Sequence, residues 1–223
     1  MGGESGQAVV EAALILPAVL VLILCTIQIA QLQQARVLVE YAAFNAARAG
    51  VVQNGNAGEG GATGPMHDAA ALSLLPAAGR TDDLGWLGRT WAAFRARAAA
   101  SRALGLPIVA VSILNPRRAD FHRLGQHLGG SEIDFDDVRP QAVDANLLSI
   151  RVRYLAELRV PFANKLIHSL WLARRAVRRP DDGGGVEVAA LAVAAKRGRY
   201  LVPLEAFYTM RMQSNPFLRW AAP

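Results

Sequence analysis

The strongest constraint on this chain is a long apolar run near its N-terminus. No Asp, Glu, Lys or Arg occurs from Ala12 to Ala35, and the centre of the run, Ala12 to Ala30, reads AALILPAVLVLILCTIQIA. A helix of these 19 residues would be about 29 Å long, which matches the hydrocarbon thickness of a bilayer. Buried core helices rarely run this far without a charge. The run therefore predicts one transmembrane helix.

Composition limits what the rest of the chain can be. The 223 residues include 52% hydrophobic side chains, and 24 basic against 18 acidic residues give a net charge of +6. This apolar content excludes disorder along the whole chain, and about 170 residues beyond the helix suffice for a hydrophobic core. Because Cys25 is the only cysteine, an internal disulfide framework and CxxC metal or redox sites are excluded. The basic balance suits nucleic acid, anionic lipid or an acidic partner equally.

A short motif precedes the apolar run. Gly6 is followed by Gln7, then by three small or apolar residues, and then by Glu11. Cleavage after Gly6 would leave Gln7 as the first residue and Glu11 as the fifth, an arrangement that resembles a type IV prepilin processing site. The segment GQAVVEAALILPAVLVLIL, with its continuation to AAFNAARAG, is similar to TadE-like minor pseudopilins of tight-adherence pili. The resemblance is strong over Gly6 to Gly50 and weak at TMRMQS, Thr209 to Ser214.

The resemblance implies a structural subunit rather than an enzyme, with no catalytic residues, cofactor or metal. It implies cleavage by a prepilin peptidase, with other pilin and pseudopilin subunits, the assembly platform in the bacterial inner membrane, and membrane lipid as partners. No nucleic acid is expected. It also implies a single-pass protein with a cytoplasmic N-terminus and an extracytoplasmic C-terminal domain. In pilins the acid corresponding to Glu11 is thought to pair with the free N-terminal amine of a neighbouring subunit, which here would be that of Gln7.

Other interpretations of the N-terminus remain open. Glu11 could instead lie among lipid headgroups and favour the N-terminus of a helix. The segment could be a cleaved secretory signal, although it lacks a basic n-region and a small-x-small cleavage site, or an uncleaved anchor. Arg36 and Arg48 follow the apolar run, and the positive-inside rule would place that side in the cytoplasm, opposite to the pilin orientation.

The helix is expected to continue to Gly50, about 40 residues in all. Pro17 removes one helical hydrogen bond and should kink the helix, which gives it a possible role in assembly. A stripe of mostly small residues follows at heptad spacing: Leu32, Ala35, Val39, Ala42, Ala46 and Ala49. This stripe could pack on other subunits, on the protein's own domain, or on both. Arg36 and Glu40 form an i,i+4 pair on another face.

The remaining pattern predicts an α+β fold, in which the long transmembrane and stalk helix packs on an antiparallel β-sheet domain with additional helices. We expect a leader at 1–6, the transmembrane helix and stalk at 7–50, and an extracytoplasmic domain at 51–223. A loop is expected at 51–65, with helices at 67–75 and 86–104. Strands are expected at 108–114 and 148–160, and a hairpin at 186–195 and 200–212 that turns at 196–199.

A basic segment, Asn164 to Arg179, interrupts the strands and favours an amphipathic helix. Its candidate residues for contact with a membrane surface are Trp171, Arg174, Arg175, Arg178 and Arg179. A basic helix that carries Trp can lie on anionic lipid. The simpler interpretation is a surface helix whose arginines favour its C-terminal dipole.

Few residues suggest chemistry. The four histidines, His67, His122, His127 and His168, form no metal motif. Glu132, Asp134, Asp136 and Asp137 alternate as calcium ligands can, but the turn glycine and the distal Glu are missing, which favours a polar strand edge or loop. The alternatives to a pilus subunit are a membrane-anchored periplasmic enzyme or binding module, which would need convergent polar groups, and a nucleic-acid binder that uses Arg174 to Arg179.

Overall fold

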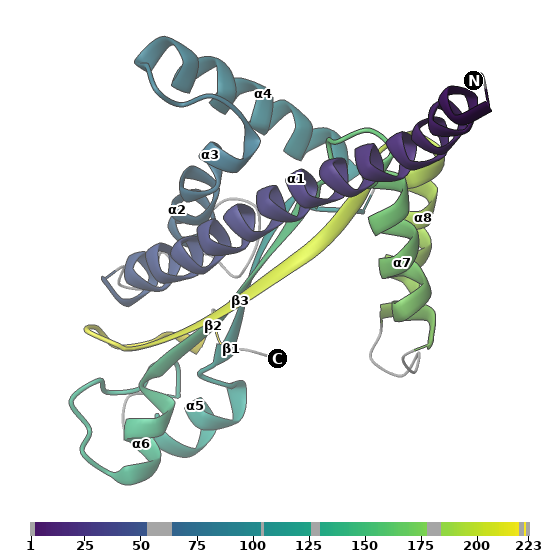
Figure 1. Ribbon diagram of the computed structural model, residues 1–223. Helices are drawn as coiled ribbons and strands as arrows, with labels where there is room; N and C mark the ends of the chain where they lie inside the picture. Colours follow the sequence, from purple (N-terminus) through teal and green to yellow (C-terminus); the bar gives the residue numbers. More distant parts are fainter. Residues whose placement is uncertain are drawn as a thin grey trace. The chain divides into compact units, whose positions relative to one another are not determined.

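The computed structural model describes residues 3–52, 64–103, 105–125, 130–177, 184–218 and 221. It contains a long N-terminal helix, a three-stranded sheet in the order β1-β2-β3, and further helices (Figure 1). The helices are α1 (Gly3–Val52), α2 (Pro65–Ser73), α3 (Leu75–Ala78), α4 (Leu84–Ala103), α5 (Arg118–Leu124), α6 (Pro140–Ala145), α7 (Ala163–Val177) and α8 (Gly184–Lys196). The strands are β1 (Val109–Asn115), β2 (Leu147–Glu157) and β3 (Leu201–Arg211). The predicted α+β fold is confirmed.

The chain divides into two compact units, and each is described by itself. Unit 1 comprises Met1–Gln34 and Ala156–Val202, and unit 2 comprises Ala35–Leu155 and Pro203–Pro223. Three elements, α1, β2 and β3, contribute residues to both units. The predicted loop at 51–65 and the predicted leader lie partly outside the described residues.

In unit 2, the strands predicted at 108–114 and 148–160 form and pair in the antiparallel arrangement that was expected. β1 and β2 are antiparallel, with Val109 opposite Tyr154 and Val111 opposite Val152. Side chains alternate between buried and half-buried along most of β2, which matches the apolar and charged alternation of the sequence. The hydroxyls of Ser149 on β2 and Thr209 on β3 are 2.8 Å apart.

One predicted strand is wrong. Residues 186–195 lie in helix α8, so the hairpin expected with 200–212 does not form, and residues 197–200 instead join α8 to β3. The segment VEVAALAVAA has no polar alternation beyond Glu187, and five of its ten residues are Ala. Alanine has the highest helix propensity, which outweighs the β preference of the three valines. The last strand is where the sequence predicts it.

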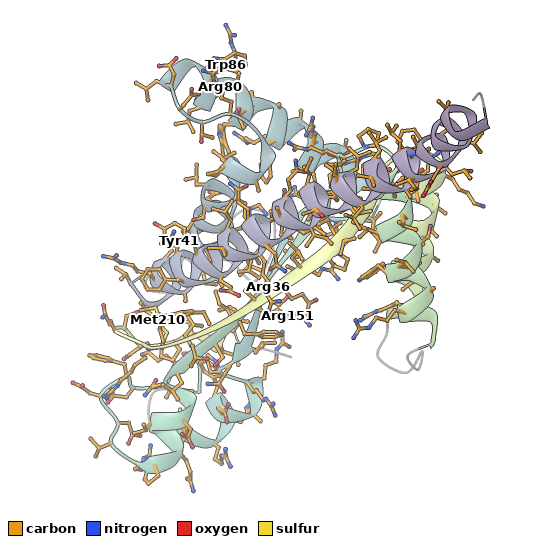
Figure 2. All side chains as sticks on the ribbon, in the orientation of Figure 1. Arg36, Tyr41, Arg80, Trp86, Arg151 and Met210 are labelled. Atoms are coloured by element: carbon orange, nitrogen blue, oxygen red, sulfur yellow. The ribbon has the colours of Figure 1, made fainter. Side chains whose placement is uncertain are left out.

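Helix α4 also forms as predicted, but its surface is mostly exposed. Phe94 and Ser101 are its buried residues. At its N-terminal end the guanidinium of Arg80 lies 5.4 Å from the centre of the Trp86 ring, and Figure 2 shows the two side chains close together. This cation–π contact covers part of an otherwise exposed Trp.

Candidate membrane and assembly helix

The first part of α1, Val9 to Ala30, exposes its apolar side chains and is called the exposed half below. Leu14 is 74% exposed, Leu16 is 68% exposed and Leu22 is 67% exposed. The most apolar window of this helix is long and apolar enough to cross a membrane, and only 6% of it is buried. A core helix of a soluble protein would be covered by its own fold. Continuous apolar exposure of this extent matches a lipid environment.

The residues singled out for processing and assembly lie at the start of this helix. Gly6 and Gln7 are within α1, although side chains before Val9 lie outside the described residues. Glu11 is exposed and lies one helical turn, about 6 Å along the axis, beyond Gln7. Pro17 lies inside α1, and helix continues on both sides of it. Since proline has no N–H, the carbonyl of Ala13 lacks its helical donor.

The exposed half contains one buried polar side chain that sequence reasoning missed. Gln28 is 1% exposed, and its Oε1 accepts a hydrogen bond of 2.8 Å from the backbone N–H of Val160. Both residues belong to unit 1. The only signal in the sequence is an amide within an apolar run. This bond attaches the segment that follows β2 to α1 at Gln28.

The second part of α1, Ala35 to Val52, is called the buried half. The central part of the small-residue stripe packs inside unit 2, with Val39 1% exposed and Ala42 and Ala46 fully buried. Of the two predicted uses of this stripe, packing on the protein's own domain is therefore present. The predicted pair of Arg36 and Glu40 is also present, at 3.5 Å on the exposed face.

Gly50 shows how close this packing is. A Cβ atom there would lie 2.5 Å from Sδ of Met66 and 2.8 Å from Cδ2 of Leu148, distances that side chains do not tolerate without moving. The helix continues two residues beyond Gly50, to Val52, so this glycine permits close approach of α2 and β2 rather than ending the helix.

The sequence of α1 also matches a known family. Residues 6–48 match the family model of TadE-like proteins. The match covers both halves of α1 up to its last turn, and we call residues 6–48 the TadE-like segment. Comparison with the curated proteins and with the solved structures gives no match.

Outside the TadE-like segment, α7 holds the predicted basic surface. Arg174 and Arg175 are exposed, whereas Arg178 and Arg179 lie outside the described residues. Trp171 does not project from the surface: it is half-buried and stacks on His168, with ring centres 6.2 Å apart. The predicted contact of Trp171 with a membrane surface stays a prediction, because part of its side chain packs against His168 and part remains exposed.

His168 lies beneath Trp171 and packs edge-on against Tyr200, with ring centres 5.6 Å apart. The side chain is 2% exposed. Burial lowers the pKa of His168, an effect opposed by a backbone hydrogen bond at Leu201. A neutral imidazole is thus favoured at neutral pH, which suits a packing role for this residue.

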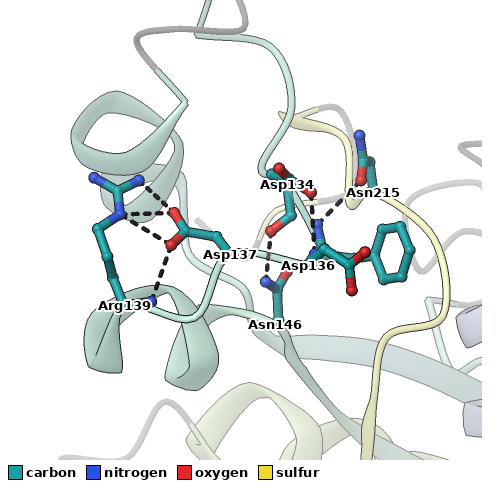
Figure 3. A network of polar contacts seen from close by, with 7 residues as sticks. Asp134, Asp136, Asp137, Arg139, Asn146 and Asn215 are labelled. Carbon is teal, nitrogen blue, oxygen red and sulfur yellow. Dashed lines mark hydrogen bonds and ion pairs between the residues drawn. The ribbon is translucent and has the colours of Figure 1, made fainter.

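The acidic segment around Asp134 is a hydrogen-bonded loop (Figure 3). Asp134 Oδ1 accepts a bond from the N–H of Asp136, its carbonyl accepts one from the Asn146 amide, and Asp137 pairs with Arg139. Asn215 accepts a bond from the N–H of Phe135, which connects the loop to the end of the chain. Among the described residues, no three His, Cys, Asp or Glu side chains converge as metal ligands. These hydrogen bonds favour the interpretation of this segment as a polar loop.

Proposed function

We propose that the protein is a minor pseudopilin-like structural subunit that takes part in assembly of a tight-adherence, type IV-like pilus. The exposed half of α1 spans the inner membrane, with the N-terminus in the cytoplasm and the folded domain outside. A prepilin peptidase cuts after Gly6, and the processed subunit associates with other pilin and pseudopilin subunits and with the assembly platform. The chain contributes assembly contacts rather than a reaction.

The observation that carries this proposal is the division of α1 within one family match. The TadE-like segment has an exposed apolar half, which suits lipid and neighbouring membrane helices, and a buried half that is built into a folded domain. A subunit needs both properties, because it must be held in the membrane before assembly and must present a folded domain afterwards.

In the proposed assembly, Glu11 forms an ion pair with a neighbouring subunit. A carboxylate near the edge of a membrane helix is costly unless it is paired. Cleavage after Gly6 releases a cationic amine at Gln7, and the Glu11 carboxylate of one subunit pairs with that amine on a neighbour. The apolar surface around Glu11, which includes Val10 and Leu14, is exposed and available to such a neighbour.

N-terminal sequencing of the protein from membranes of cells with an active prepilin peptidase tests the processing step. The expected first residue is Gln7, and Gly6→Ala should leave the leader attached. Glu11→Gln should still be cleaved but should fail to enter pili. Protein that keeps residues 1–6 in those cells, or Glu11→Gln protein that enters pili normally, would contradict the proposal.

A further inference from the structure

Helix α7 presents an apolar row that none of the described residues covers. Phe162, immediately before the helix, is 69% exposed, Leu166 is 46% exposed and Leu170 is 63% exposed. Their spacing of four residues places them along one side of the helix. Trp171 and the buried His168 lie toward the interior of unit 1. The exposed row, here called the α7 apolar row, is therefore separate from the packed face.

Cations lie beside this row. Lys165 and Arg174 are exposed, and at 100° per residue they fall on opposite sides of the line through Leu166 and Leu170. Residues 163–177 contain no Asp or Glu. An apolar row bordered by cations, with no acidic residue in the helix, is complementary to a surface of apolar chains with anionic headgroups.

The position of α7 relative to the membrane helix supports the same partner. The hydrogen bond between Val160 and Gln28 joins two points near element ends. Val160 lies three residues before α7 begins, and Gln28 lies two residues before Ala30, where the exposed half of α1 ends. Within unit 1, α7 runs beside α8 and is directed across α1 rather than along it (Figure 1). A helix that starts where the membrane span ends, and crosses its direction, can lie along the bilayer surface.

We propose that α7 is an interfacial helix, docked on the anionic leaflet from which α1 emerges. Phe162, Leu166 and Leu170 enter the boundary between headgroups and acyl chains, and Lys165 and Arg174 bind lipid phosphates. This inference rests on membrane anchoring by α1 in the proposed function. It places the lipid contact on the α7 apolar row rather than on Trp171.

Spin labels in the full-length protein test the docking. Single cysteines at Leu166, Leu170, Leu20 and Val138 are introduced one at a time after Cys25→Ser, and the protein is placed in nanodiscs rich in phosphatidylglycerol. Leu20 lies in the exposed half of α1, and Val138 is an 85% exposed residue of unit 2. Accessibility of each label to oxygen, which concentrates in lipid, and to a water-soluble nickel chelate is then measured.

Labels at positions 166 and 170 should respond to oxygen as the label at 20 does, whereas the label at 138 should respond to nickel. Lys165→Gln with Arg174→Gln should reduce the docked-to-undocked ratio roughly fivefold for each cation removed, and discs of phosphatidylcholine alone should do the same. Circular dichroism checks that each variant is folded.

The outcomes separate this inference from the one on which it rests. Nickel access at 166 and 170, with position 20 in lipid, would overturn docking but leave anchoring intact. Nickel access at position 20 would overturn both. Protection of 166 and 170 from both reagents would indicate a protein partner, and equal docking in phosphatidylcholine would remove the role of the cations; either result would overturn the proposal.

Discussion

The two halves of α1 belong to one helix, yet their side chains have opposite surroundings. Val9 to Ala30 is rich in Leu, Ile and Val and is almost wholly exposed, whereas Ala35 to Val52 is rich in Ala and buries one side within unit 2. Hydrophobicity alone therefore does not indicate which part of a helix enters the protein core. Residue size does: small side chains let α2 and the sheet approach the helix backbone, as at Gly50.

The largest expected effect is that of a charge on membrane insertion, which should be impaired far more in the exposed half than in the buried half. Leu20→Arg places a cation near the middle of the apolar run, which should cost about 2.5 to 3.5 kcal/mol of insertion free energy. The expected result is a large fall in the membrane-bound fraction after alkaline extraction. Val37→Arg, at an exposed position of the buried half, is the matched control and should remain membrane-bound. Equal loss for both variants would mean that the two halves do not differ in this way.

A larger side chain should destabilise the protein in the buried half and have no effect in the exposed half. Ala46 is fully buried, so Ala46→Leu should lower the free energy of unfolding by about 1 to 3 kcal/mol through overpacking. Ala18→Leu makes the same change at an exposed position and should leave it unchanged. Denaturant unfolding of the detergent-solubilised protein measures both. Similar stability for the two variants would show that the stripe is not tightly packed.

The buried amide of Gln28 is an exception within the exposed half, because it attaches the chain at Val160 to α1. Gln28→Leu removes the acceptor of the Val160 N–H, and a buried unsatisfied donor should cost about 1 to 2 kcal/mol. Hydrogen exchange of the Val160 amide should become faster. Gln31→Leu, an exposed neighbour, should leave that exchange unchanged, and an effect of equal size there would contradict the attachment.

The smallest expected effect is the pH dependence from His168. Its pKa is lowered in the folded protein, so the unfolded chain binds more protons in acid. Stability should be independent of His168 above its ordinary pKa of about 6.5 and should fall as the pH drops below that value. His168→Gln should flatten the dependence of the urea midpoint between neutral and acidic pH. His122→Gln, at an exposed position, should retain the wild-type slope.

The features that were predictable from sequence are those with a clear period or a long uniform run. The apolar run specifies a helix, and the small-residue stripe and the alternation along β2 each specify an element and its buried face. Residues 186–195 were mispredicted because a run of Ala and Val fits a buried strand and a helix equally well by pattern. The attachment at Gln28 depends on a partner 132 residues away in the chain, and the burial of Trp171 depends on packing against His168. Local sequence does not encode either contact.

The distance along the chain between Gln28 and Val160 has a consequence during synthesis. A ribosome adding about 5 to 20 residues per second needs roughly 7 to 26 s to make the 132 residues that separate them. Gln28 has therefore left the exit tunnel well before Val160 is synthesised. Unit 1 can therefore close only after α1 has been made, and until then the side-chain Oε1 of Gln28 lacks the Val160 N–H as its donor.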